Sequence, residues 1–210
     1  MPELYDAILN GNAKAAVEWT RKALEAGADA LHVVTSEMVP AMDEVGRRYE
    51  CEEYFVPELL LSARAMKSAL ELLRPLLAAG HAQPAGVVAI GTVKGDLHDI
   101  GKNIVAAMLE GGGFEVIDLG TDVDASAFVD TVRNRGANLV CLSTLLTVTM
   151  PSMKATVEAL SAAGVRDRIK IMVGGAPVTE RFAQQIGADG YSDNAAGAVS
   201  LARKLTAACA

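Results

Sequence analysis

Apolar positions divide the chain into two parts with different periods. In residues 1–80, apolar residues recur at spacings of three and four, which is typical of amphipathic helices. The pattern predicts one helix in NAKAAVEWTRKALEAG, ended by Gly27, and a second from Thr35 to Tyr49 with Pro40 near its first turn. A third helix is predicted in VPELLLSARAMKSALELLRPLL. With no strand pattern in this part, we expect an antiparallel helical bundle over residues 1–83.

Short apolar runs alternate with amphipathic segments in residues 84–210. The runs in GVVAIGTV, FEVIDLG, ANLVCLS, IKIMVGG and ADGYS predict five strands, and the segments between them predict helices. This alternation favours an α/β domain of the flavodoxin or Rossmann-like type, with helices on both faces of a five-stranded parallel sheet in the order 2-1-3-4-5. GHAQPAG, residues 80–86, predicts a linker between the two domains.

Composition and charge narrow the class of protein. The chain has 210 residues and a net charge of -7, without a basic stripe, so we expect no nucleic-acid partner. Its three cysteines are widely spaced and odd in number, which argues against a disulfide framework or a cysteine metal site and fits a reducing cytoplasm. The N-terminus lacks the blocks of a signal peptide, and no apolar run has the length of a membrane span. We therefore expect a cytoplasmic protein without a membrane partner.

Candidate chemistry lies where strands end. Ligands of open α/β sheets bind beyond the carboxyl ends of the strands. The loop after the first strand carries Asp96, Leu97, His98, Asp99 and Gly101; the loop after the third carries Ser143, Thr144, Thr147 and Thr149; Gly174 and Gly175 follow the fourth. Each of these residues alone has an ordinary explanation as a helix cap or a turn. In the expected strand order the three loops are neighbours, so we expect one shared site.

The pair Asp96 and His98 indicates a metal-bound imidazole. Asp96 is placed to accept the second ring N–H of His98, which is the usual partner of a histidine that ligates a metal. One histidine cannot hold a bare zinc ion, which needs three or four protein ligands. The metal would have to arrive with other ligands attached, as in a tetrapyrrole. Gly101 would let a flat ring lie close to the helix start, and Gly174 and Gly175 would leave room for a slot.

These motifs resemble those of a known family. GDLHDIGKNIV resembles the Asp-x-His-x-x-Gly signature of cobalamin-binding domains, Ser143 and Thr147 match its Ser-x-x-x-Thr stretch, and Gly174 and Gly175 match its Gly-Gly step. FVPELLLSARAMKSAL is similar to the helical cap that precedes such domains. The chain thus resembles, over nearly its whole length, the corrinoid proteins of methyltransferase systems and the corresponding module of methionine synthase. It departs from that module in having Thr149 in place of a serine.

The resemblance implies how a corrinoid would be bound. Cobalamin or a related corrinoid would bind base-off, with its own lower base displaced and His98 as the lower axial ligand of cobalt, while Asp96 and Thr149 would form a proton relay behind it. Cofactor contacts are implied for Gly95, Asp96, Leu97, His98, Asp99, Gly101, Ser143, Leu145, Thr147, Thr149, Gly174 and Gly175, and for Tyr49, Val56, Leu59 and Leu60 of the helical cap. The four cap residues would contact the methyl group.

The same resemblance implies a methyl carrier, cycling between Co(I) and methyl-Co(III), that is not catalytic alone. A substrate-specific methyltransferase would load it with methyl from methanol, a methylamine, a betaine or an aryl methyl ether. A second methyltransferase would pass the methyl group to a tetrahydrofolate-type pterin or a thiol, and a reductive activator would serve the cofactor.

Three other classes of protein share parts of this pattern. An adenosylcobalamin mutase subunit has the Asp-x-His-x-x-Gly module but usually works with a barrel and lacks this cap. A cobalamin-sensing regulator has a helical cap but needs a DNA-binding domain. A phospho-receiver shares the sheet order but needs an acidic pair after the first strand and a lysine after the fifth.

Overall fold

The computed structural model describes residues 2–79 and 84–207. The chain divides into two compact units, Met1–Pro84 with Glu110–Gly113, and Ala85–Leu109 with Phe114–Ala210. The expected boundary between residues 83 and 84 stays a prediction, because residues 80–83 of the expected linker lie outside the described residues. No helix in the described ranges is long and apolar enough to cross a membrane.

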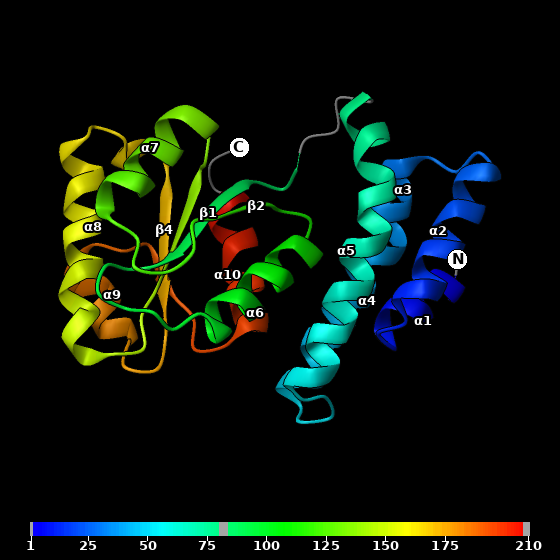
Figure 1. Ribbon diagram of the computed structural model, residues 1–210, viewed down its shortest axis with the longest axis horizontal. Coiled ribbons are helices and arrows are strands. Elements are labelled where there is room, and N and C mark those ends of the chain that lie inside the picture. The colour runs from blue at the N-terminus through cyan, green and yellow to red at the C-terminus, as the bar shows by residue number, and fades with distance from the viewer. Residues whose placement is uncertain (1, 80–83, 208–210) are drawn as a thin grey trace. The chain divides into compact units, whose positions relative to one another are not determined.

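The first unit is helical, with α1 (Pro2–Leu9), α2 (Ala13–Glu25), α3 (Ala30–Val33), a π-helical turn (Val34–Met38), α4 (Val39–Glu50) and α5 (Val56–Ala79) (Figure 1). Helix α5 packs against α2 and α4. One side of α5 is buried in this unit at helical spacing, by Leu59, Ala63, Met66, Ala69 and Leu73. The bundle predicted from the apolar spacing is therefore present.

The start of the second predicted helix was wrong. The chain is already helical at Ala30, because the side chain of Asp29 caps this end by accepting the backbone N–H of His32 at 2.8 Å. Thr35, the expected first residue, lies in the π-helical turn, and its hydroxyl donates to the Leu31 carbonyl at 2.9 Å. Pro40 stands in the first turn of α4, directly after the π-helical turn. Helix α1 was not predicted, because eight residues are too few for a helical period to stand out.

The second unit is the expected parallel sheet, in the order β2-β1-β3-β4-β5. Its strands are β1 (Val87–Thr92), β2 (Glu115–Asp118), β3 (Leu139–Ser143), β4 (Lys170–Gly174) and β5 (Gly190–Tyr191). In Figure 1, α7 (Ala125–Arg135), α8 (Met150–Ala162) and α9 (Glu180–Ile186) cover one face, and α6 (Ile100–Gly111) and α10 (Ala195–Ala207) cover the other. Apolar residues of β1, β3 and β4 are buried between these layers.

The register of the sheet brings three loops together. Thr92 at the end of β1 pairs with Ser143 at the end of β3, and Ser143 pairs with Gly174 at the end of β4. On its other side, β1 pairs with β2, where Ile90 is opposite Asp118. The segment that carries His98 therefore leaves the sheet between the loops that follow β2 and β3.

Candidate functional site

Asp96 and His98 form a fixed pair in the segment between β1 and α6. One carboxylate oxygen of Asp96, Oδ1, accepts the backbone N–H of His98 at 3.0 Å and contacts ring atom Nδ1 at 2.8 Å. The Asp96 side chain is 0% exposed, whereas that of His98 is 52% exposed. A carboxylate can only accept, so this bond places a proton on Nδ1 and leaves the lone pair of the neutral ring on Nε2. His98 thus presents Nε2 as a possible metal ligand, and the bond to Asp96 fixes the orientation of its ring.

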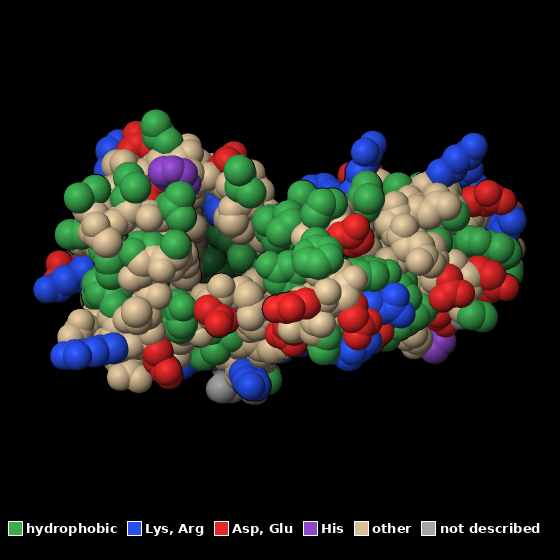
Figure 2. Space-filling model, turned by 90° about the horizontal axis from the view of Figure 1, so that it is seen from below, with side chains coloured by type: hydrophobic (Ala, Val, Ile, Leu, Met, Phe, Trp, Pro, Cys, Tyr) green, Lys and Arg blue, Asp and Glu red, His purple; other side chains and the backbone are tan. Residues whose placement is uncertain are grey.

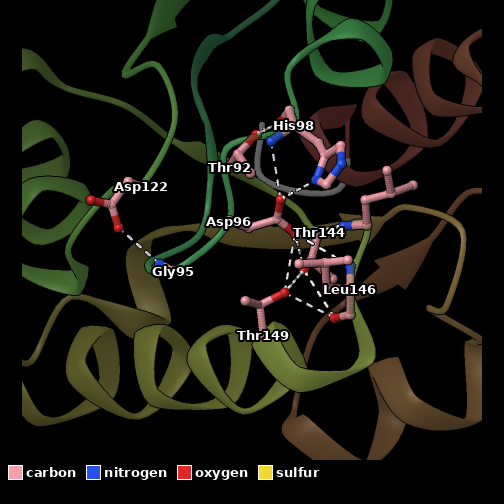
Figure 3. A network of polar contacts seen from close by, with 9 residues as sticks. Thr92, Gly95, Asp96, His98, Asp122, Thr144, Leu146 and Thr149 are labelled. Atoms are coloured by element: carbon pink, nitrogen blue, oxygen red, sulfur yellow. Dashed lines mark hydrogen bonds and ion pairs between the residues drawn. The ribbon is translucent and has the colours of Figure 1, made fainter.

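The second oxygen of Asp96, Oδ2, is surrounded by donors from the loop after β3 (Figure 3). It accepts the hydroxyls of Thr144 at 2.8 Å and Thr149 at 3.1 Å, and the backbone N–H groups of Leu145 at 2.7 Å and Leu146 at 3.3 Å. The two threonine hydroxyls also lie within hydrogen-bond distance of each other, so their two protons are shared among these contacts. One buried carboxylate therefore joins the histidine to two hydroxyls.

The sequence analysis expected Thr149 in this role and left Thr144 without one. Both hydroxyls lie within hydrogen-bond distance of Asp96 and of the Leu146 carbonyl oxygen. Thr92 was missed as well: its buried hydroxyl donates to the His98 carbonyl at 2.8 Å. A buried threonine at the last position of a strand, next to the candidate loop, is the signal that could have identified it.

The environment of Asp96 favours its charged form. Burial raises the pKa of this carboxyl, but hydrogen bonds from the backbone N–H groups of Leu145 and His98, from the His98 ring and from the Thr144 hydroxyl outweigh burial. The pKa therefore lies well below its ordinary value. The carboxylate remains ionised and keeps accepting from His98 over the whole physiological range.

We expect the Asp96 carboxylate to make the free energy of unfolding of the cofactor-free protein depend on pH in the acid range. Because its pKa is lower in the folded than in the unfolded chain, its contribution is complete above the unfolded pKa of about 3.9 and is lost as pH falls through the folded value. Urea unfolding at pH values from 7 down to 3 measures this. Asp96→Asn should lose less stability on acidification than the unaltered protein, and Asp99→Asn should behave like the unaltered protein. Equal losses in all three would contradict the assignment.

Apolar side chains surround the histidine. The largest exposed apolar residues of the α/β unit lie in the segments next to it: Leu97, Ile100, Leu145, Leu146 and Val148. Figure 2 shows such side chains around the histidine on this face. Gly101 in the first turn of α6 has nothing within 4 Å of where a Cβ would stand. This surface is open and apolar, as a large flat ligand requires.

Gly174 and Gly175 have a structural role that the sequence analysis did not assign to them. At Gly175, φ is +122°, and a Cβ would overlap the backbone carbonyl of Thr144. A Cβ at Gly174 would lie 3.0 Å from the carbonyl oxygen of Ser192. The glycines therefore let neighbouring backbone segments meet, and the space on these sides is filled by the chain itself. Whether they also line a cofactor pocket stays a prediction.

The other expected residues fall into two groups. In the α/β unit, Gly95, Asp99 and Thr147 are exposed and Ser143 is half-buried, all in the loops that adjoin His98. In the helical unit, Tyr49 and Val56 are half-buried and Leu60 is 42% exposed, whereas Leu59 is 0% exposed. Leu59 therefore lies in the bundle core, and a contact of these four residues with the methyl group stays a prediction.

The donor set fits a cofactor that brings most of its own ligands. No group of three or more His, Cys, Asp or Glu side chains that could hold a metal ion occurs among the described residues. A single imidazole, fixed by a buried carboxylate within an apolar surface, suits the axial position of a metal in a macrocycle.

Comparison with known proteins agrees with this geometry. Residues 86–200 match the family model described as "B12 binding domain", and residues 2–74 match a second model with the same description. A corrinoid protein of Desulfitobacterium hafniense is 39% identical over 208 residues, covering 98% of this chain and 96% of the relative. The trimethylamine corrinoid protein of Methanosarcina barkeri is 42% identical over 197 residues, covering 93% and 91%.

A solved structure is similar over nearly the whole chain. The methanol:cobalamin methyltransferase complex of Methanosarcina barkeri contains a chain that matches with a TM-score of 0.86 and 31% identity, over 98% of this chain and 78% of that one. The two matched domain models and the corrinoid relatives agree with the motifs around His98. The chain belongs to the family of B12-binding corrinoid proteins of methyltransferase systems.

Proposed function

We propose that this protein carries methyl groups on a corrinoid bound base-off, with Nε2 of His98 as the lower axial ligand of cobalt. The observation that carries the proposal is the bond between the buried Asp96 carboxylate and Nδ1 of the exposed His98 ring, at 2.8 Å. This bond selects the tautomer whose Nε2 can ligate a metal. The bound corrinoid would supply a cobalt ion that accepts a methyl group from one partner and gives it to another.

The side chains behind His98 would tune this ligand. Asp96 holds the ring in one orientation and keeps a proton at Nδ1, which raises the basicity of Nε2. Thr144 and Thr149 donate to the far oxygen of Asp96 and would take up changes in its charge by shifting their shared hydrogen bonds. We infer that these three residues act together as the relay that the sequence assigned to Asp96 and Thr149.

The apolar side chains around His98 would bind the ring system and exclude water. Leu97, Ile100 and Val148 expose most of their apolar surface in the described structure. Covering them with a macrocycle would remove that surface from water and contribute to cofactor affinity. The polar residues Ser143 and Thr147 lie on the same loop as the threonine pair, and we infer that they bind polar groups of the cofactor tail.

The partners are inferred from relatives. The curated relatives include corrinoid proteins named for trimethylamine and dimethylamine, and the structural relative is part of a methanol:cobalamin methyltransferase complex. We therefore infer that a methyltransferase specific for a small methylated amine or alcohol loads this protein. A second methyltransferase with a pterin or thiol acceptor would unload it, and a reductive activator would restore it.

Substitution of His98 tests the axial ligand. The protein is loaded with hydroxocobalamin, and the visible spectrum of the bound cofactor is compared for the unaltered protein, His98→Ala and, as a matched control, His32→Ala. His32 is an exposed histidine of the helical unit. We expect His98→Ala alone to shift the spectrum to that of a corrinoid without a nitrogen ligand, because this substitution removes the lower ligand.

Isotope labelling identifies the nitrogen. After reduction to Co(II), an axial nitrogen splits the electron paramagnetic resonance lines, and ¹⁴N and ¹⁵N split them differently. Labelling only the protein's histidines with ¹⁵N should change this splitting in the unaltered protein. An unchanged splitting, or an unchanged spectrum in His98→Ala, would contradict the proposal.

The helical unit offers a separate prediction on shielding of the methyl group. Leu60, exposed in the described structure, should affect the cofactor, whereas the buried Leu59 should affect folding. We expect Leu60→Ala to speed photolysis of bound methylcobalamin with little change in melting temperature. Leu59→Ala should lower the free energy of unfolding by about 2–5 kcal/mol. Unchanged photolysis in Leu60→Ala would count against a shielding role for this face.

A further inference from the structure

The loop between β2 and α7 bonds to the backbone next to Asp96, and Figure 3 shows the bond between Asp122 and Gly95. Asp122 accepts the N–H of Gly95 through its side-chain oxygen Oδ1 at 2.8 Å. Its own backbone N–H donates to the carbonyl oxygen of Asp96 at 2.9 Å. These reciprocal bonds hold the N–H of Gly95 on one side of the Asp96 α-carbon and the carbonyl group of Asp96 on the other. They come from a loop that carries none of the residues assigned to the cofactor.

Asp122 is held in a conformation that few residues adopt. Its φ is +54°, in the left-handed region, where asparagine, aspartate and glycine are the favoured residues. The neighbouring backbone keeps it there, since the N–H of Thr92 donates to the Gly120 carbonyl at 3.0 Å and the N–H of Val123 donates to the Thr92 carbonyl at 3.0 Å. The structure surrounding Asp122 therefore determines where its side chain points.

The position of Asp96 matters because its carboxylate bonds to His98 on one side and to the hydroxyls of Thr144 and Thr149 on the other. Gly95, immediately before it, has a φ of +86°, so the chain turns sharply into Asp96. A small rotation of the Asp96 backbone would break the bond to His98 Nδ1 on one side or the bonds to the threonine hydroxyls on the other. Holding the Gly95 N–H and the Asp96 carbonyl restricts this rotation.

We propose that Asp122 is a positioning residue for the axial ligand: by holding the Gly95 N–H and the Asp96 carbonyl, it sets the orientation of the His98 ring. This inference rests on the proposed function of His98 as the ligand of cobalt. It assigns to the loop after β2 a part in coordination that the motifs around His98 do not contain. Asp122 acts through Asp96 and does not itself touch the cofactor.

Asp122 positions Asp96 through the placement of its acceptor oxygen, and the negative charge of its side chain contributes little. Lys94 pairs with the other oxygen of Asp122 at 3.3 Å and with Asp124 at 3.4 Å, but all three side chains are exposed. Ion pairs of this kind contribute little. The pKa of Asp122 is lowered first by the Gly95 N–H and then by Lys94. A neutral residue that keeps the acceptor and tolerates the same φ should therefore serve as well.

Three variants separate these contributions. Asp122→Gly keeps the left-handed backbone and its N–H but removes the acceptor. Asp122→Asn keeps both the backbone preference and an acceptor oxygen, and Lys94→Ala removes the ion pair alone. Each protein is titrated with hydroxocobalamin, and the affinity and the fraction of histidine-ligated cofactor at saturation are measured from the visible spectrum.

We expect Asp122→Gly to bind about tenfold more weakly and to leave part of the bound cofactor without a histidine ligand, as changes behind a metal-binding histidine do. Asp122→Asn and Lys94→Ala should match the unaltered protein. Because glycine is favoured at this φ, Asp122→Gly should keep its melting temperature. An unchanged spectrum and affinity in Asp122→Gly, or equal losses in Asp122→Asn, would overturn the proposal.

A measurement without cofactor keeps this test separate from that of the proposed function. In the cofactor-free protein, Asp122→Gly should speed hydrogen exchange of the Gly95 and His98 amides, while those in β3 keep their rates. Unchanged exchange at both amides would overturn the positioning role, whatever His98→Ala shows. A failure of His98→Ala to alter the spectrum would refute the axial ligand and leave this exchange result standing.

Discussion

Gly175→Ala is expected to disrupt the α/β unit, with a loss in the free energy of unfolding of about 4 kcal/mol or more. The added Cβ would overlap the carbonyl group of Thr144, and this neighbour is backbone that cannot turn away. The φ of +122° adds strain for any residue with a Cβ. Relief would require the loops after β3 and β4 to separate, which would also move the hydroxyl that Thr144 donates to Asp96.

Two other glycines are matched controls for this substitution. Gly164 also has a positive φ, +70°, but nothing lies within 4 Å of the position that a Cβ would take there, so Gly164→Ala should cost only about 1–2 kcal/mol. Gly101 is helical with open space around it, and Gly101→Ala should be neutral or slightly stabilising. Urea unfolding of the cofactor-free proteins ranks the three. A loss at Gly175 no larger than that at Gly164 would show that the two loops separate easily.

Gly175 also illustrates where the sequence was informative and where it was not. The glycine pair marked a position of close approach, but the sequence could not tell whether a ligand or the chain itself comes close. The partner is the backbone of Thr144, in the preceding strand's loop, which becomes a neighbour only through the pairing of β3 with β4. A Gly-Gly step predicts proximity without naming what is near.

The fold was predictable because its signals are local. Buried parallel strands appear as unbroken apolar runs, and their alternation with amphipathic segments predicts the layered sheet. The strand order 2-1-3-4-5 was confirmed. The prediction failed at the start of the second helix, which begins at Ala30 and not at Thr35. This start depends on one capping aspartate and on the π-helical turn that follows, and neither changes the spacing of the apolar residues.

The site was predictable where its residues are close in sequence. Asp96 and His98 are two positions apart, so their hydrogen bond could be expected from spacing. Thr144 directly follows Ser143 in the sequence, which does not show whether its hydroxyl points toward Asp96 or away from it. Asp122 was overlooked because the prediction considered only the loops after β1, β3 and β4, although the same strand order makes β2 the other neighbour of β1. Contacts between loops follow from strand order, and both neighbours of a strand must be considered.

Asp96→Asn should remove His98 from cobalt while leaving most of the corrinoid bound. The oxygens of Asp96 accept only from donors: the N–H and ring of His98 on one side, and two hydroxyls and two backbone N–H groups on the other. An asparagine must turn its NH₂ group toward one of these sets. Facing Leu145 and Leu146 would oppose two backbone N–H groups, whereas facing His98 would oppose one, because the ring nitrogen can change from donor to acceptor. The amide should therefore turn its NH₂ toward His98.

An NH₂ group beside Nδ1 reverses the tautomer of His98. Nδ1 would accept, the ring proton would move to Nε2, and the nitrogen that should ligate cobalt would lose its free lone pair. We expect the histidine-ligated form to weaken by about 10–100-fold. Affinity for the whole cofactor should fall less, because the apolar residues around His98 are unchanged. Asp99→Asn, at the exposed aspartate on the other side of His98, is the matched control.

Ring nitrogen shifts give the decisive measurement, because they report the tautomer without any cofactor. In the ¹⁵N-histidine-labelled, cofactor-free protein, the proton should lie on Nδ1 of His98 in the unaltered chain and in Asp99→Asn, and on Nε2 in Asp96→Asn. The visible spectrum of bound hydroxocobalamin should lose its histidine-ligated form in Asp96→Asn. If Asp96→Asn kept both the Nδ1 proton and the histidine-ligated spectrum, Asp96 would not select the tautomer, and the ligand would have to be held by Thr92 and the backbone of the loop alone.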